Sequence, residues 1–159
     1  MKTRLVLAGL AAISVAAIVH AAAGPELLRL TPADIAAMPS ISAGAGTSGI
    51  AAIRTTVLYG DPTKPGAYTI ALKVPANTRI AAHSHRDERT AVVVSGTWYF
   101  GFGDHASDAL RKPLPPGSFY TEPAQVTHFA RTGATPAIVY ISGYGPTDTK
   151  YVEANAAPR

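Results

Sequence analysis

The 159-residue sequence contains no cysteine. This absence excludes disulfide bonds, cysteine-ligated zinc, iron–sulfur clusters and a cysteine nucleophile. Any catalysis therefore has to use histidine, carboxylate or tyrosine side chains, or a metal ion that such side chains hold.

The chain also has little excess charge of one sign. Fourteen Lys and Arg residues are balanced by ten Asp and Glu residues, and two of the basic residues, Lys2 and Arg4, lie at the extreme N-terminus. Without these two, twelve basic residues stand against ten acidic ones, and no long run of Lys or Arg occurs. This distribution does not favour a nucleic-acid-binding or polybasic membrane surface.

Residues 1–23 are typical of a secretory signal peptide. A basic start is followed by an uncharged, apolar stretch over 5–19 and then by three alanines at 21–23. The apolar stretch is shorter than the roughly 20 residues that a membrane-spanning helix needs, so a retained membrane anchor is the weaker interpretation. We expect the mature protein to begin near Ala22 or Gly24 and to be periplasmic or secreted.

Residues 24–49 are predicted to form an N-terminal extension with one short helix. Residues 31–34 read Thr-Pro-Ala-Asp, which places an N-cap residue, a proline and an acid in the order that favours a helix start. Pro39 ends this segment, so we expect a helix over 32–38. The Ser-, Ala- and Gly-rich stretch that follows predicts a loop that leads into the main domain.

After residue 50 the apolar residues alternate with a period of two. Eight short β-type runs, separated by Gly, Pro, Asn and Asp, occupy 53–59, 68–74, 79–85, 90–95, 97–102, 117–122, 126–131 and 137–143. Because no helical pattern interrupts them, the sequence predicts an all-β sandwich or barrel, most naturally a double-sheet jelly roll. We place this barrel at 50–145 and a C-terminal tail at 146–159, whose end after Glu153 is expected to fray.

Three histidines are the strongest chemical signal. His83 and His85 are two residues apart, which places both on the same face of a strand. His128 follows a turn and begins another predicted strand. Three neutral imidazole nitrogens from neighbouring strands can hold one first-row divalent ion and leave coordination positions open for water or substrate.

These segments resemble the two sequence motifs of the cupin superfamily. The first motif reads Gly-x5-His-x-His-x3–4-Glu-x6-Gly, and the second reads Gly-x5-Pro-x-Gly-x2-His-x3-Asn. All spacings are kept over about 60 residues. The matching positions are, in order, Asn77, His83, His85, Arg89 and Gly96, then Gly117, Pro123, Gln125, His128 and Thr132.

The resemblance implies a double-stranded β-helix, or jelly-roll barrel, in which His83, His85 and His128 bind Fe, Mn, Ni or Zn. It also implies a small-molecule substrate and a homodimer formed through edge strands. Functions of the superfamily include dioxygenases, isomerases, epimerases, decarboxylases and non-catalytic binding proteins, so the fold alone does not select one.

Four positions, Asn77, Arg89, Gln125 and Thr132, depart from the motif residues. Asn77 and Gln125 replace glycines, and asparagine tolerates a left-handed turn better than glutamine does. Arg89 replaces the carboxylate ligand, and a guanidinium cannot coordinate a cation. Glu88 is adjacent to Arg89 and is a secondary candidate ligand. A shift of one residue turns a strand side chain to the opposite face, so Glu88 could reach the site only if a bulge re-aims it.

Arg89 has two interpretations. A charged side chain inside a small barrel is costly unless it is paired, which favours an internal salt bridge to Asp87, Glu88 or Glu122. The functional interpretation is a clamp for a substrate carboxylate or enolate beside the metal, which would make Arg89 catalytic.

Tyr120 is the second candidate catalytic residue, as a proton donor. His105 follows Gly103-Asp104 and is expected to be a solvated loop residue, and His20 lies in the segment expected to be removed. The preferred hypothesis is a metal-dependent oxidoreductase of dioxygenase type that acts on a small organic molecule. The alternatives are a non-enzymatic small-molecule or metal-binding protein, in which Arg89 binds an anion, and ordinary half-buried strand histidines.

Overall fold

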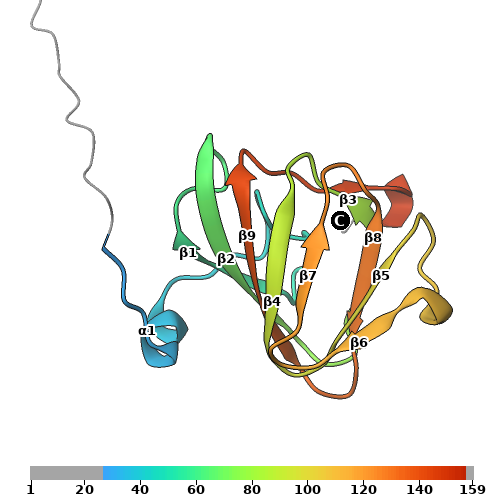
Figure 1. Cartoon of the computed structure of the whole chain (residues 1–159), viewed down its shortest axis with the longest axis horizontal. Coiled ribbons are helices and arrows are strands. Elements are labelled where there is room, and N and C mark those ends of the chain that lie inside the picture. The colour runs from blue at the N-terminus through green and yellow to red at the C-terminus, as the bar shows by residue number, and fades with distance from the viewer. Residues whose placement is uncertain (1–26, 157–159) are drawn as a thin grey trace, which may run out of the picture.

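The computed structural model describes residues 27–156, so the predicted signal peptide and the start of the mature chain lie outside the described residues. The first element is the helix α1 (Pro32–Ala37), which lies at one side of the barrel (Figure 1). Thr31 and Asp34 form a reciprocal capping box, because each side chain bonds to the backbone N–H of the other. The helix expected over 32–38 is therefore present.

Ten strands form two five-stranded antiparallel sheets. The first sheet has the order β1 (Arg54–Tyr59), β2 (Gly66–Val74), β9 (Ala137–Gly145), β4 (Arg89–Ser95) and β7 (Phe119–Glu122). The second has the order β10 (Lys150–Tyr151), β3 (Arg79–Ser84), β8 (His128–Thr132), β5 (Trp98–Phe102) and β6 (Lys112–Leu114). Two single turns of 3-10 helix, η1 (Asp108–Leu110) and η2 (Ala154–Ala156), complete the described chain. The predicted all-β jelly roll is confirmed.

The core lies between the inner faces of the two sheets. On β4, for example, Arg89, Ala91 and Val93 are buried, whereas the alternate residues Thr90 and Val92 are exposed. This alternation places Arg89 on the inner face, in line with the apolar core. The packing of apolar side chains between the two sheets therefore also positions the polar residues on their inner faces.

All eight expected strands are present, and two further strands are too short to have a periodic pattern. Strand β6 has three residues and contains Pro113, which an edge strand tolerates because its N–H side need not pair. Strand β10 has two residues and pairs with β3 at Ser84 and His83. The sheet therefore extends beyond the predicted barrel boundary at 145 and into the segment expected to be a tail.

Two turns have the backbone conformation that the motif glycines would favour. Asn77 has φ 55° and Gln125 has φ 61°, both in the left-handed region. The Gln125 N–H donates to the carbonyl of His85 at 2.7 Å, so this turn connects the two histidine segments. No helix within the described residues is long and apolar enough to cross a membrane.

Candidate metal centre

The structure brings the three predicted histidines together. His83 lies on β3, His85 follows directly after the end of this strand, and His128 begins β8. His83 and His128 are cross-strand partners, and one nitrogen of each of the three rings lies within 4.8 Å of the other two. All three side chains are buried, at 5% exposure or less.

Each ring is oriented by a hydrogen bond to the backbone. The Nδ1 atoms of His83, His85 and His128 contact the carbonyl oxygens of Ala81, Asp148 and Val126, at 2.7, 2.5 and 3.1 Å. Because a carbonyl only accepts, Nδ1 carries the proton and donates it in each case. The lone pair is then on Nε2, which is the arrangement that a metal-binding histidine needs.

The chemistry of these nitrogens fits a divalent ion. The Nε2 atoms of His85 and His128 are buried and have no hydrogen-bond partner in the described part of the chain. Burial lowers the pKa of His83 to about 4, with a further contribution from His128, and burial also lowers the pKa of His85 and of His128. All three imidazoles are therefore neutral near pH 7 and offer unpartnered lone pairs to one centre.

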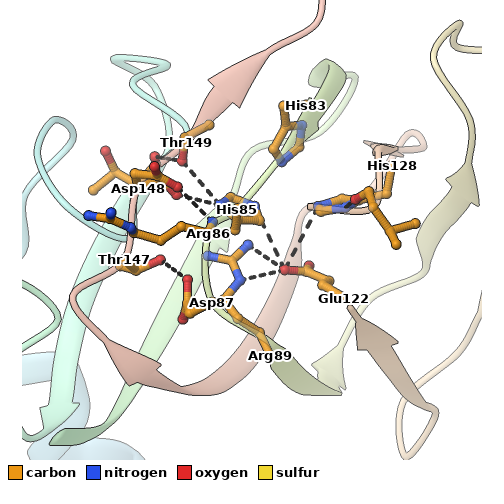
Figure 2. Close-up of polar contacts among 12 residues, drawn as sticks. His83, His85, Arg86, Asp87, Arg89, Glu122, His128, Thr147, Asp148 and Thr149 are labelled. Carbon is orange, nitrogen blue, oxygen red and sulfur yellow. Dashed lines mark hydrogen bonds and ion pairs between the residues drawn. The ribbon is translucent and has the colours of Figure 1, made fainter. Parts of the chain in front are cut away.

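Arg89 and Glu122 form a buried ion pair next to the histidines. They are direct cross-strand partners on β4 and β7, and both are less than 5% exposed. The Arg89 Nε donates to Glu122 Oε2 at 2.6 Å, and a terminal guanidinium nitrogen contacts the same oxygen (Figure 2). Burial alone would raise the pKa of Glu122, but the Arg89 charge lowers it below its usual value.

The structure therefore shows the internal salt bridge that the sequence allowed for Arg89, and Glu122 is its partner. Glu88, the secondary candidate ligand, is exposed and does not join the site. No bulge re-aims it, because Arg89 rather than Glu88 has the inward register on β4. Glu88 is therefore not placed to act as the secondary ligand that the sequence allowed.

Asp87 has a supporting role that the sequence did not indicate. Its two oxygens accept hydrogen bonds from the Tyr68 hydroxyl at 2.6 Å and from the Thr147 hydroxyl at 2.5 Å. Thr147 immediately precedes Asp148, whose carbonyl accepts from His85 Nδ1. Asp87 thus fixes the C-terminal segment that orients His85. The only signal in the sequence was that Asp87 is two residues after His85 and so shares its face.

Tyr120 lies on the inner face of β7, two residues before Glu122. Its hydroxyl is buried and has no hydrogen-bond partner among the described residues. Burial and the nearby Glu122 charge raise the pKa of Tyr120 well above its usual value, so the phenol stays protonated. His105 is 84% exposed at its side chain and lies apart from the three-histidine group, near Glu153.

A small internal cavity joins these residues. It has a volume of about 20 Å³ and is lined by the three histidines, the Arg89–Glu122 pair and Tyr120, with apolar side chains around them. This volume holds about one ion or water molecule. Residues 46–48 close one side, and they are fastened by Thr149, which donates to the carbonyl of Thr47 at 2.9 Å, and by Tyr151, which donates to the carbonyl of Ser48 at 2.7 Å.

A larger groove of about 490 Å³ lies on the other side of His85. Its lining includes Arg86, Gln125 and Lys150, and His85 is the residue that it shares with the small cavity. His85 therefore lies between the small cavity and this surface groove.

Comparisons with known proteins support the fold. No protein-family model matches the sequence, and no curated protein matches it. Among solved structures, the polyketide cyclase RemF from Streptomyces resistomycificus is similar with a TM-score of 0.65 and 15% identity, over 84% of this chain and 90% of that one. An RmlC-like cupin from Shewanella frigidimarina has a TM-score of 0.53 and 16% identity, over 69% of this chain and 85% of that one.

A third solved structure, the DMSP lyase DddQ from Ruegeria pomeroyi, has a TM-score of 0.55 and 19% identity, over 69% of this chain and 57% of that one. At these identities the similarity establishes the fold. The chain has the cupin fold that its two motifs predicted, with a buried three-histidine group where a metal ion can bind.

Proposed function

We propose that this protein is a metal-dependent oxidoreductase of dioxygenase type that acts on a small organic molecule. The observation that carries the proposal is the convergence of three neutral, backbone-oriented imidazoles from His83, His85 and His128. Such nitrogen donors suit Fe, Mn, Ni or Zn and leave further coordination positions free. A bound ion would act as a Lewis acid toward a chelating carbonyl or enol, and iron would add oxygen chemistry.

The residues around the histidines fit this reaction class. Tyr120 lines the cavity, and its hydroxyl is protonated and has no hydrogen-bond partner among the described residues, which supports a role as proton donor to a bound substrate. The apolar walls, which include Trp98 and Phe100, exclude bulk water from the centre. Structural neighbours include a cyclase and a lyase, so the fold is compatible with several reactions and the site has to select one.

The size of the cavity supports a second candidate, a metal-binding protein without catalytic activity. A volume of about 20 Å³ admits an ion but no organic substrate unless residues 46–48 move. The version of this alternative in which Arg89 binds an anionic ligand is less favoured, because Glu122 already neutralises the guanidinium.

Metal analysis of the natively purified protein tests both candidates. We expect close to one first-row ion per chain, strongly reduced by His83→Ala or His128→Ala and unchanged by His105→Ala, the matched exposed control. Equal metal content in all three variants would reject the ligand assignment.

Two measurements on the iron(II)-loaded protein then distinguish the enzyme from the metal-binding protein without catalytic activity. Nitric oxide, an oxygen surrogate, should give the electron paramagnetic resonance signal of a high-spin iron nitrosyl if a coordination position is open to small molecules. We also expect oxygen consumption with one member of a panel of small enols, diketones and thiols. A metal-loaded protein that shows neither response would support the binding protein.

Location and assembly complete the proposal. We propose that residues 1–23 are removed on export to the periplasm or the cell exterior, and that two chains associate as a homodimer. N-terminal sequencing of the exported protein should begin near Ala22 or Gly24. Light scattering of the purified protein should give twice the mass of the mature chain.

A further inference from the structure

We propose that Glu122 supplies a fourth protein ligand to the ion held by the three histidines. This inference rests on the metal site proposed above and adds a residue to it. Glu122 comes from β7 in the first sheet, whereas the histidines come from the second sheet, so the ion would join the two sheets.

The distances place the carboxylate beside two of the three histidines. Glu122 Oε2 lies 3.8 Å from the Nε2 of His85 and 3.8 Å from the Nε2 of His128. Ligands bound at about 2.0–2.2 Å to one ion lie about 3.0–3.6 Å apart when they are adjacent. The oxygen is therefore within a few tenths of an ångström of a ligand position relative to two of the three nitrogens.

The contacts between Glu122 and the two histidines bring hydrogen-bond acceptors together. The Nδ1 atoms of His85 and His128 donate to carbonyls, so their Nε2 atoms carry lone pairs and no proton. A carboxylate oxygen is also an acceptor. The Arg89 guanidinium bonds to the Glu122 oxygen, but among the described residues no donor bonds to the Nε2 atom of His85 or His128, so a cation between the carboxylate and these two imidazoles would make the 3.8 Å contacts favourable.

The neighbouring carboxylates do not compete for this role. Both oxygens of Asp87 accept hydrogen bonds from Tyr68 and Thr147, and Glu88 is exposed. Oε2 of Glu122 accepts from Arg89 and also faces the Nε2 atoms of His85 and His128 (Figure 2). The guanidinium thus offsets the cost of burying the carboxylate, while the same oxygen lies 3.8 Å from the Nε2 atoms of His85 and His128.

Cobalt titration of the chelator-treated full-length protein tests the inference, because Co²⁺ reports affinity and ligand number through its visible absorption. We expect Glu122→Gln to weaken Co²⁺ binding at least about tenfold and to change the absorption bands. Glu88→Gln, a matched control at an exposed glutamate next to Arg89, should change neither.

A charge-neutral double variant separates coordination from electrostatics. Glu122→Gln alone leaves the Arg89 charge unpaired, and this charge would repel a cation even if Glu122 were not a ligand. In Arg89→Met/Glu122→Gln both charges are gone, so a ligand role predicts that binding stays weak and the bands stay changed. Recovery of the wild-type affinity and bands would overturn the inference.

Three further results complete the test. If the Gln variants do not fold, Glu122→Asp keeps the charge and withdraws the oxygen by one methylene, so a ligand role still predicts weaker binding and altered bands; unchanged binding would contradict it. Wild-type affinity in Glu122→Gln would overturn the role of Glu122 and leave the three-histidine site intact. Failure of the wild-type protein to bind Co²⁺ would instead overturn the proposed function itself.

Discussion

Acidification should destabilise the metal-free protein through its buried histidines. His83 has a pKa of about 4 in the folded protein, against an ordinary value of 6.5 in the unfolded chain. Below pH 6.5 the His83 imidazole becomes protonated in the unfolded chain, whereas in the folded protein it stays neutral until the pH approaches 4. The contribution of neutral His83 to the free energy of unfolding is therefore fully present above pH 6.5 and is lost as the pH falls toward 4.

The magnitude follows from proton linkage. Between pH 7.5 and pH 5.0 a histidine with these two pKa values lowers the free energy of unfolding by about 2 kcal/mol. His85 and His128 also have lowered pKa values in the folded state, so they add to this loss with the same sign. The total is comparable to a large part of the stability of a domain of this size.

Urea unfolding with a chelator present measures the effect. The wild-type protein should lose several kcal/mol between the two pH values, and His83→Gln should lose about 2 kcal/mol less than wild type. The control His105→Gln, at an exposed loop position, should behave as wild type. An identical pH dependence in His83→Gln and wild type would show that His83 is not held neutral by burial, and would refute the reasoning.

Three further substitutions test the supports of the site. Asp87→Asn should lower the free energy of unfolding by about 1–3 kcal/mol and weaken metal retention, measured by urea unfolding and cobalt titration, because a buried hydrogen-bond network loses an acceptor. Gln125→Gly should raise the unfolding free energy by up to about 1 kcal/mol, whereas the neighbouring control Ala124→Gly should lower it, since Gln125 alone of the two has a positive φ. Tyr151→Phe removes the hydrogen bond to the carbonyl of Ser48 and should speed metal removal by a chelator in a stopped-flow assay; an unchanged rate would show that this contact does not limit exit.

The strands were predictable because alternation is a local property of the sequence. Each of the long runs, such as 68–74 and 90–95, has enough residues to show a period of two, and the structure places a strand at each. The strands β6 and β10 are too short to show any period, and their pairing depends on partners far away in the chain. The position of β10 beside His83 was therefore outside the reach of pattern analysis.

The site was predictable to the extent that its spacing is local. The sequence predicts the three residues that the structure brings together, because His83 and His85 are two residues apart on a strand and a turn precedes His128. The arginine at position 89 predicts the loss of the motif's carboxylate ligand, and an ion pair of Arg89 with a nearby acid is one of its two interpretations. The choice of Glu122 over Asp87 required the register of β4 with β7, which pairs residue 89 with residue 122 directly and which no single strand encodes.

The three orienting hydrogen bonds show the same division between local and distant information. His83 and His128 donate to carbonyls two residues earlier in the chain, so a strand that reaches these positions already supplies the acceptor. His85 donates to Asp148, 63 residues away, in a segment that the Thr147–Asp87 and Arg86–Asp148 hydrogen bonds also fasten. The direction of two lone pairs thus follows from local backbone, whereas the third depends on docking of the C-terminal segment. Folding of residues 146–151 against β3 is consequently a condition for three convergent nitrogens, and this segment belongs to the metal centre as much as the motif residues do.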